Sequence, residues 1–312
     1  MASLNVQDVF VPRLEKQNTR FSSRDAIVLL TFDDNYVDQS INLILSVAAH
    51  HPEGVSFVCI CPELKDAHVQ QLLALEQGIL VKCYGYVPAV DTGRWSACAV
   101  FRLFCPWLLA EDIGRVLYMD SDILCTRSLQ PLFELEVPCI AMAGEISGNV
   151  SSTQEETFRK EFPTQIYCNS GVVLFNLDHL RQNYTFDQLY STLLDMSGNY
   201  IYLDQDFLNA YFMGKITYLN TYQYNFQAYE LRRTRLYHKA IRYARLVHFS
   251  VGKPWTYKSD LILTALYLKH SRHPAMIRRV RKAACLGLLY RPFANLRRFL
   301  ADIKYTFVPV TK

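Results

Sequence analysis

The stretch RVLYMDSDILC, residues 115 to 125, joins a short apolar run to two acids placed one residue apart. The run 116–119 is typical of a buried strand. In an extended segment residues i and i+2 point the same way, so Asp120 and Asp122 can present both carboxylates to one point. Like charges this close repel unless a cation lies between them, and hard oxygen ligands favour Mg²⁺, Mn²⁺ or Ca²⁺. We interpret the pair as metal ligands; the alternative is a turn in which Asp122 caps a helix.

Upstream of this stretch, apolar runs alternate with helical patterns. The sequence predicts strands at 26–32, 54–61, 79–87 and 115–120, and helices at 40–51, 65–78 and 98–109, with Gly78 as the C-cap of the second helix. This alternation predicts an α/β fold with a mostly parallel central sheet. The G-x-G-x-x-G fingerprint of dinucleotide-binding folds is absent. Ligands of such sheets collect beyond the carboxyl ends of strands, where the acids 33, 34, 120 and 122 lie.

Downstream, the pattern predicts three further elements. Residues 165–177 form a strand or a hairpin that turns at Asn169-Ser170-Gly171, residues 203–214 form a helix with an acidic start, and 244–255 form a strand followed by a glycine turn. His248 ends the last strand and is either an ordinary polar residue near the core or a metal ligand. A glycine at 252 lets backbone approach a phosphate, and a lysine at 253 neutralises it.

The start of the helix at 203–214 carries Asp204, Gln205 and Asp206. Acids at this position cap a helix and interact favourably with its dipole, which is one interpretation. In the other, Asp204 and Gln205 face a polar pocket and bind sugar hydroxyls.

Charge is distributed unevenly along the chain of 312 residues, whose net charge is +4. Residues 1–24 are polar and patternless and are expected to form a flexible arm, and 25–260 form the main domain. From 269 onward eleven Lys and Arg accompany one acid, so 261–312 is interpreted as a basic amphipathic segment on an anionic membrane face, or else as a helix packed on the main domain. The six Lys and Arg of 229–245 suit a lid over an acidic glycan or a solvated face.

Targeting and cysteine patterns favour a cytoplasmic protein. We expect no signal peptide and no membrane-spanning helix, since no run approaches the roughly 18 apolar residues that a span needs. The cysteines number nine, and most lie in apolar runs. They are interpreted as reduced, buried thiols, with a disulfide or zinc framework as the alternative.

Seven motifs in one order resemble glycosyltransferase family 8, and within it the bacterial lipopolysaccharide and lipooligosaccharide galactosyl- and glucosyltransferases. They are FDDNY (32–36), FRL (101–103), RVLYMDSDILCTRSLQPLFEL (115–135), YCNSGVVLFNL (167–177), YLDQDFLNA (202–210), YNFQ (224–227) and VHFSVGKPW (247–255). The resemblance spans about residues 26 to 256 and implies a GT-A type nucleotide-binding fold over 25–260. It also implies transfer of galactose or glucose from a UDP-sugar to a glycan, with retention of configuration and with Mn²⁺ or Mg²⁺.

The resemblance further implies the roles of individual residues. Asp120, Asp122 and His248 would be the metal ligands, and Gln205 and Asp204 would be catalytic, with Gln205 nearest the reactive carbon. The nucleotide-sugar would be held by Thr31, Asp33, Asn35, Arg102, Asp120, Ser121, Asn169, Gly252 and Lys253.

The expected partners are a UDP-sugar, an oligosaccharide or glycolipid acceptor of anionic character, and the inner face of the cytoplasmic membrane, with no nucleic acid. Two other functions stay open. A nucleotidyltransferase that makes a nucleotide-sugar also uses an α/β sheet, acids and Mg²⁺, but usually has a glycine-rich phosphate loop where this chain has TFDDNY. A non-catalytic sugar-binding protein of the same fold is the third, and an intact set of metal ligands argues against it.

Overall fold

The structure is a computed structural model that describes residues 4–87, 96–144, 166–196, 202–232, 241–257 and 261–290. The chain divides into two compact units. The first comprises Met1–Val37, Pro52–Ser121 and Gln130–Leu219, and the second comprises Asp38–His51, Asp122–Leu129 and Asn220–Lys312.

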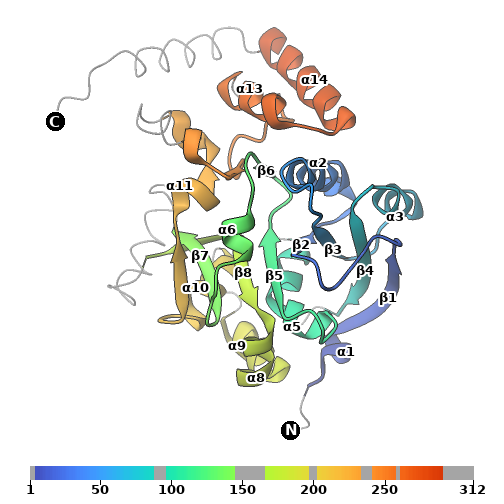
Figure 1. Cartoon of the computed structure of the whole chain (residues 1–312), viewed down its shortest axis with the longest axis vertical. Helices are drawn as coiled ribbons and strands as arrows, with labels where there is room; N and C mark the ends of the chain where they lie inside the picture. Colours follow the sequence, from blue (N-terminus) through green and yellow to red (C-terminus); the bar gives the residue numbers. More distant parts are fainter. Residues whose placement is uncertain are drawn as a thin grey trace, which may run out of the picture. The chain divides into compact units, whose positions relative to one another are not determined.

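An eight-stranded sheet forms the first unit, in the order β1-β4-β3-β2-β5-β8-β7-β9 (Figure 1). The strands are β1 Phe10–Gln17, β2 Ile27–Thr31, β3 Ser56–Cys61, β4 Gly78–Tyr86, β5 Arg115–Met119, β7 Ile140–Gly144, β8 Cys168–Asn176 and β9 Ile216–Leu219. All run in one direction except β1 and β8, which pair antiparallel with their neighbours. The expected α/β fold with a mostly parallel central sheet is therefore confirmed.

Short helices surround this sheet. They are α1 Val6–Val9, η1 Asp34–Tyr36, α3 Asp66–Leu73, α4 Cys98–Phe101, η2 Arg102–Phe104, α5 Cys105–Leu108, α6 Gln130–Phe133, α8 Leu177–Asn183, α9 Phe186–Met196 and α10 Leu203–Tyr211. The core strands β2 and β3 are buried at every position, as their continuous apolar sequence predicts for a sheet covered on both faces. Beneath the helices, Phe10, Phe104, Phe186 and Tyr190 pack ring against ring.

The second unit contains a small sheet in the order β10-β11-β6. Its elements are β6 Ile123–Cys125, α11 Thr221–Tyr224, β10 Phe226–Gln227, η3 Ala228–Arg232, η4 Ile241–Tyr243, β11 Leu246–His248, α13 Leu261–His270 and α14 Pro274–Tyr290, and most of α2 Val37–Ala48 belongs to it. The buried Asn42 of α2 donates to Tyr267 at 2.9 Å and accepts from the backbone of Arg272 at 2.8 Å. The Asn42 side chain therefore connects α2 to the junction between α13 and α14 by hydrogen bonds.

The segment expected as a flexible arm is different in the structure. Residues 10–17 form β1, which pairs along its length with β4, and Phe10 is only 1% exposed. The prediction failed because β1 is an edge strand whose other side chains are mostly exposed, so the sequence shows no apolar alternation.

At two glycines the structure also differs from the prediction. Helix α3 ends at Leu73, and Gly78 begins β4 instead of capping the helix. A Cβ at Gly78 would lie 2.7 Å from the Arg20 carbonyl, so close packing requires the glycine. The turn expected at Asn169-Ser170-Gly171 is a register shift inside the continuous strand β8, where Met142 pairs with Val173 but Ala143 pairs with Asn169.

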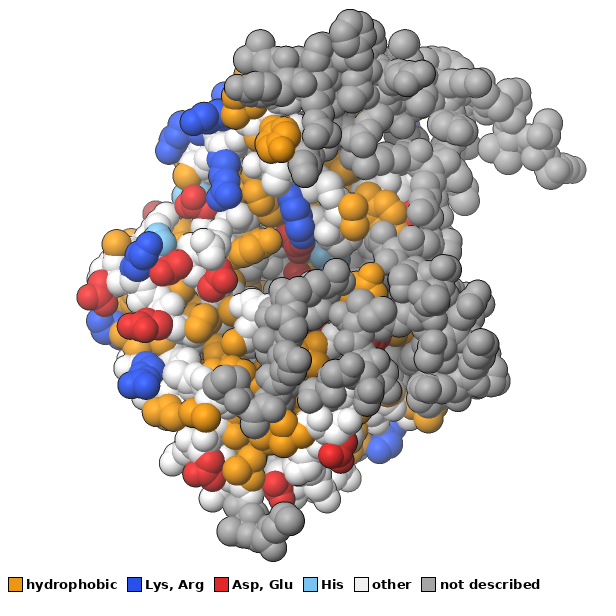
Figure 2. Space-filling model, turned by 180° about the vertical axis from the view of Figure 1, so that it is seen from behind, with side chains coloured by type: hydrophobic (Ala, Val, Ile, Leu, Met, Phe, Trp, Pro, Cys, Tyr) orange, Lys and Arg blue, Asp and Glu red, His pale blue; other side chains and the backbone are white. Residues whose placement is uncertain are grey.

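Within the described residues, no helix is long and apolar enough to cross a membrane. All nine cysteines are free thiols, and eight of them are buried, as expected. On the face seen in Figure 2, acidic and basic side chains both occur among hydrophobic ones. The basic stretch 233–240 and the tail 291–312 lie outside the described residues, so the predictions for them stay predictions.

Candidate active site

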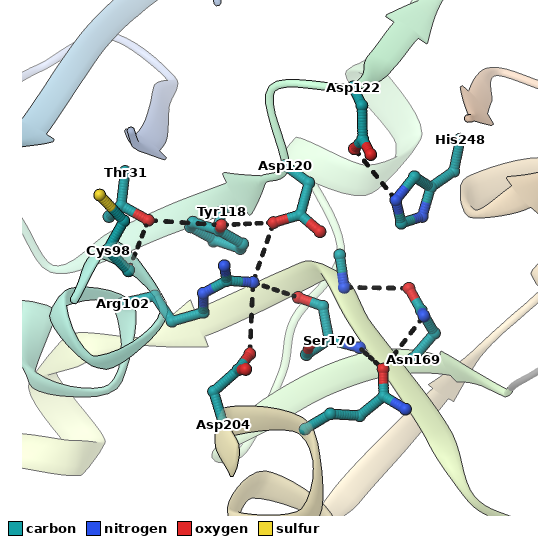
Figure 3. Close-up of polar contacts among 12 residues, drawn as sticks. Thr31, Cys98, Arg102, Tyr118, Asp120, Asp122, Asn169, Ser170, Asp204 and His248 are labelled. Carbon is teal, nitrogen blue, oxygen red and sulfur yellow. Dashed lines mark hydrogen bonds and ion pairs between the residues drawn. The ribbon is translucent and has the colours of Figure 1, made fainter. Parts of the chain in front are cut away.

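The carboxyl end of β5 places Asp120 in a network of buried polar groups (Figure 3). Tyr118 lies two residues earlier on the same side of the strand, and its hydroxyl donates to Asp120 Oδ1 at 2.5 Å. Burial raises the pKa of Tyr118, so the hydroxyl keeps its proton and acts as the donor. Thr31, at the end of neighbouring β2, lies 3.4 Å from the same hydroxyl and donates to the Cys98 carbonyl at 2.8 Å. The orientation of Asp120 is thus fixed from within the sheet.

Arg102 connects Asp120 with α10. Its Nη1 lies 2.9 Å from Asp120 and 3.3 Å from Asp204, and its guanidinium lies 4.3 Å from the centre of the Tyr118 ring. Burial opposes the charge of Arg102, but Asp120 and Asp204 outweigh it and hold the pKa above its ordinary value. Burial also raises the pKa of Asp204, against the opposing effect of Arg102. One guanidinium therefore serves two carboxylates, which favours a further cation nearby.

Helix α10 places the three polar residues of its acidic start in different surroundings. The capping contact is made by Asp206, whose carboxylate accepts from the Tyr202 backbone at 2.9 Å. Asp204 is 7% exposed and pairs with Arg102 instead. Asp204 and Gln205 therefore do not serve as caps and point into the polar network.

Gln205 has a fixed carboxamide. Its oxygen accepts from Asn169 Nδ2 and from the Ser170 backbone, each at 3.1 Å, and its nitrogen donates to the Tyr167 hydroxyl at 3.0 Å. Asn169 and Ser170 belong to the irregular part of β8, and Tyr167 directly precedes this strand. In the same part of β8, the Asp120 backbone donates to the Gly171 carbonyl at 2.9 Å. The bulge in β8 thus brings Asn169 and Ser170 to both α10 and the end of β5.

In the second unit, Asp122 and His248 form a buried pair. His248 Nε2 lies 3.1 Å from Asp122 Oδ1, and the Asp122 carboxylate also contacts Lys253 Nζ. Burial alone would raise the pKa of Asp122, but Lys253 and His248 outweigh it and hold the pKa far below its usual range. The turn before Lys253 contains Gly252 with φ +72, a conformation that glycine adopts readily.

The tautomer of His248 follows from its second contact. Nδ1 lies 2.9 Å from Asn225 Oδ1, so Nδ1 carries a proton and donates it. Nε2 then faces a carboxylate oxygen, an arrangement that needs either a second proton or a metal ion between them. A histidine that donates its other N–H to an oxygen is the usual arrangement in metal sites.

Only Ser121 separates Asp120 from Asp122 in the chain. Together with His248 they form a group of three residues that could hold a metal ion. Two carboxylates and one imidazole suit Mn²⁺ or Mg²⁺, so the residues present fit the expected metal.

The remaining predicted residues lie at the ends of β2 and β5. Asp33 caps η1 by accepting from the Asn35 backbone at 2.9 Å, which gives both residues a local structural role. Ser121 is 8% exposed. Reasoning from sequence missed Tyr118, Tyr167, Ser170 and Asn225. Tyr118 could have been found from its spacing of two residues from Asp120, which puts both on one side of a strand. The other three lie in motifs quoted above, 167–177 and 224–227, but nothing in their spacing singles them out.

The comparisons with known proteins identify the family of the chain. Residues 27–259 match the model of glycosyl transferase family 8, so the chain belongs to that family. It is 26% identical over 198 residues to a lipopolysaccharide 1,2-glucosyltransferase of Escherichia coli K12, covering 60% of this chain and 58% of the relative. It is 25% identical over 150 residues to a lipopolysaccharide 1,3-galactosyltransferase of Salmonella typhimurium LT2, covering 45% and 43% respectively.

Among solved structures, the chain resembles the galactosyltransferase LgtC in complex with donor and acceptor sugar analogues. The TM-score is 0.58 at 19% identity, covering 91% of this chain and 98% of that one. This likeness concerns the fold. The chain spans about half the length of the two curated relatives, so its substrates are addressed as proposals.

Proposed function

We propose that this protein is a retaining hexosyltransferase that moves galactose or glucose from a UDP-sugar to a glycan acceptor in the synthesis of lipopolysaccharide or another surface polysaccharide. The observation that carries the proposal is the Asp122–His248 pair at 3.1 Å, with Nδ1 held by Asn225 and with Asp120 two residues away in the chain. These residues would hold Mn²⁺ or Mg²⁺. Such an ion supplies charge stabilisation to a leaving diphosphate.

The other residues of the site would bind and orient the donor. Arg102 and Lys253 offer cations to the diphosphate, and the Gly252 turn lets backbone approach it. Thr31, Asp33 and Asn35, at the carboxyl end of β2, would hold the uridine and ribose, and Ser121 would lie between the metal ligands. Asn169, Asp204 and Gln205 would surround the hexose, because the bulge in β8 and the start of α10 bring them together.

The chemistry of the reacting carbon follows from Gln205. Retaining glycosidases use a carboxylate as nucleophile, whereas this position has an amide whose oxygen already accepts two hydrogen bonds. We therefore infer a front-face reaction. The acceptor oxygen bonds to the anomeric carbon on the side that UDP leaves, the sugar–phosphate bond breaks, and the hydroxyl proton passes to the diphosphate. Gln205 and Asp204 would position the sugar and stabilise its positive charge.

A donor assay tests the proposal. The protein is incubated with Mn²⁺ and separately with UDP-galactose, UDP-glucose and UDP-N-acetylglucosamine, and free UDP is measured. Slow hydrolysis of one hexose donor is expected, and Asp122→Asn should lower it at least about 100-fold. The matched control is Asp66→Asn, in the exposed first turn of α3, with activity unchanged. UTP formation that depends on pyrophosphate would instead identify a nucleotidyltransferase, and failure to bind UDP would identify a non-catalytic protein.

We also propose that the protein is cytoplasmic and contacts the inner face of the cytoplasmic membrane. The support is α14, whose Arg278, Arg279, Arg281 and Lys282 are all exposed, together with the eight buried thiols. Anionic lipid attracts such clusters. Sedimentation with vesicles of phosphatidylglycerol and phosphatidylcholine tests this. Replacing the four basic residues by Gln should reduce the bound fraction, and equal binding to neutral vesicles would contradict the proposal.

A further inference from the structure

A cavity of about 510 Å³ lies in the first unit, away from the network around Asp120. The residues that line it are Pro138, Cys139, His179, Asn183, Tyr184, Gly214, Lys215, Ile216 and Thr217. They come from the segment before β7, from the segment before β9 and the first two residues of that strand, and from α8 and the residue after it. Because β7, β9 and β5 run in the same direction, this cavity is at the amino ends of the strands, and Asp120 follows the carboxyl end of β5. The cavity is therefore separate from the candidate active site.

The polar groups of this cavity are mostly hydrogen-bond donors. Lys215 Nζ donates to the Tyr184 hydroxyl at 2.7 Å and lies 5.0 Å from the centre of that ring. This hydrogen bond raises the pKa of Lys215, so the ammonium is charged at neutral pH. Asn183, which donates to the His179 carbonyl at 2.8 Å, and the Thr217 hydroxyl supply neutral groups. The lining thus combines one cation with amide and hydroxyl groups.

Negative charge is lacking from the lining. Among the described residues that form this cavity, none is Asp or Glu. Burial raises the pKa of the Cys139 thiol, so this group is neutral as well. A second cavity of about 390 Å³, at the same ends of the strands, is lined by Asp25 and Asp178 together with one arginine. The two cavities therefore differ in the charge of the ligand that they could accept.

The volume of the cavity and the two rings in its lining favour a sugar over a simple ion as its ligand. Ligand sites in proteins have volumes of roughly 300 to 1,000 Å³, a range that includes this cavity. Tyr184 and His179 place two rings 6.4 Å apart beside the polar groups, and rings next to amides and hydroxyls can contact the apolar and polar faces of a pyranose at once.

We propose that this cavity is an accessory binding site for an anionic hexose unit of a glycan, with Lys215 contacting the carboxylate or phosphate of the sugar. This proposal rests on the proposed function, because the acceptor of such a transferase would be an acidic glycan. That glycan contains further acidic sugar units besides the one that reacts. A site at the opposite ends of the strands from Asp120 would hold a remote part of the same acceptor chain. Binding of that remote part would raise the effective concentration of the reacting end.

Titration of the full-length protein by isothermal calorimetry and by NMR, without UDP-sugar or metal, tests the proposal. The probes are glucuronate, glucose 6-phosphate, glucose and inorganic phosphate. Glucuronate and glucose 6-phosphate should bind and shift the backbone signals of 214–217. Lys215→Gln should weaken glucuronate binding about tenfold, as expected for loss of one charge-assisted hydrogen bond. The matched control is Lys16→Gln, an exposed lysine on the edge strand β1, with no change expected.

Three outcomes would overturn the proposal. If glucose bound as tightly as glucuronate, the negative charge of the sugar would not contribute to binding. If inorganic phosphate bound as tightly as glucose 6-phosphate, the cavity would bind anions without recognising the sugar. Absence of binding by either acidic sugar would exclude the site altogether. Thr217→Val provides a second variant if Lys215→Gln is poorly folded, and it should weaken both acidic sugars. Intact glucuronate binding in a protein that releases no UDP would contradict the proposed transferase function and leave this site standing.

Discussion

At the scale of single residues, the candidate metal ligands depend on neighbouring side chains that fix their orientation by hydrogen bonds. Tyr118 orients Asp120, and Asn225 selects the tautomer of His248. Neither residue would need to touch a donor sugar. Each restricts a group whose charge and direction matter for binding a divalent ion.

Asn225→Ala should weaken Mn²⁺ binding roughly 10- to 100-fold, because His248 then loses the partner that keeps Nε2 free of a proton. Electron paramagnetic resonance of free Mn²⁺ during a titration measures the affinity. Asn225→Asp should retain most of it, since a carboxylate also accepts from Nδ1. Equal affinity of the wild type and Asn225→Ala would refute the assignment of the tautomer.

A second residue-scale prediction concerns His270, at the end of α13. Burial, followed by Lys269, His50 and Arg272, lowers its pKa to about 4. The unfolded chain therefore binds more protons than the folded chain between about pH 6.5 and 4, so the free energy of unfolding falls as pH decreases through this window. Urea unfolding at pH 7 and pH 5 should show a smaller loss for His270→Gln than for the wild type. The two losses of unfolding free energy should differ by an amount on the order of 1 kcal/mol, because His270 is only partly buried. Equal losses in the wild type and in His270→Gln would count against this role of His270.

Much of this site could be predicted from sequence because its charged members follow apolar strands. Asp120, Asp122 and His248 each stand at or near a strand end, where periodicity makes the boundary visible. Asn225 and Ser170 could not be predicted in this way. Asn225 comes from the loop before a two-residue strand, and the Ser170 contact uses the backbone, which a sequence pattern does not distinguish.

At the scale of elements, buried strands were predictable and edge strands were not. Continuous apolar runs mark β2, β3 and β5, because both faces of a parallel sheet are covered. In β1 only Phe10 of the eight residues is buried. The sequence of this strand therefore shows no alternation of apolar and polar residues. The bulge in β8 resembled a turn in sequence, since asparagine and glycine favour both.

Phe10→Ala should destabilise the protein by roughly 3 kcal/mol, the usual cost of removing a fully buried phenylalanine. Phe10 packs against Phe101, Phe104 and Phe186 with ring centres between 5.4 and 6.1 Å away. Val11→Ala, at the next and partly exposed position, is the control and should cost less than about 1 kcal/mol. Urea unfolding followed by fluorescence measures both, and equal small losses would mean that β1 contributes little to the core.

At the scale of the whole molecule, the distribution of cysteines makes a prediction about reactivity. Cys285 on α14 is exposed, and the other eight are buried. Burial raises the pKa of Cys59, Cys61 and Cys105 among them, so few thiolates form. A thiol reagent such as dithionitrobenzoate should therefore modify about one cysteine rapidly in the native protein and all nine in guanidinium chloride. Rapid modification of several native thiols would contradict the burial, and Cys285→Ser should abolish the fast phase.

Strand β1 also has a consequence for solubility. Without it, β4 would expose a nine-residue row of backbone donors and acceptors that could recruit strands from other molecules. The outer strand itself is poorly suited to recruitment, because it carries exposed Arg13, Glu15 and Lys16 and its register shifts between Pro12 and Leu14. Charge and irregularity on an outer strand discourage intermolecular pairing. The strand β1 thus protects the edge of the eight-stranded sheet against pairing with other molecules.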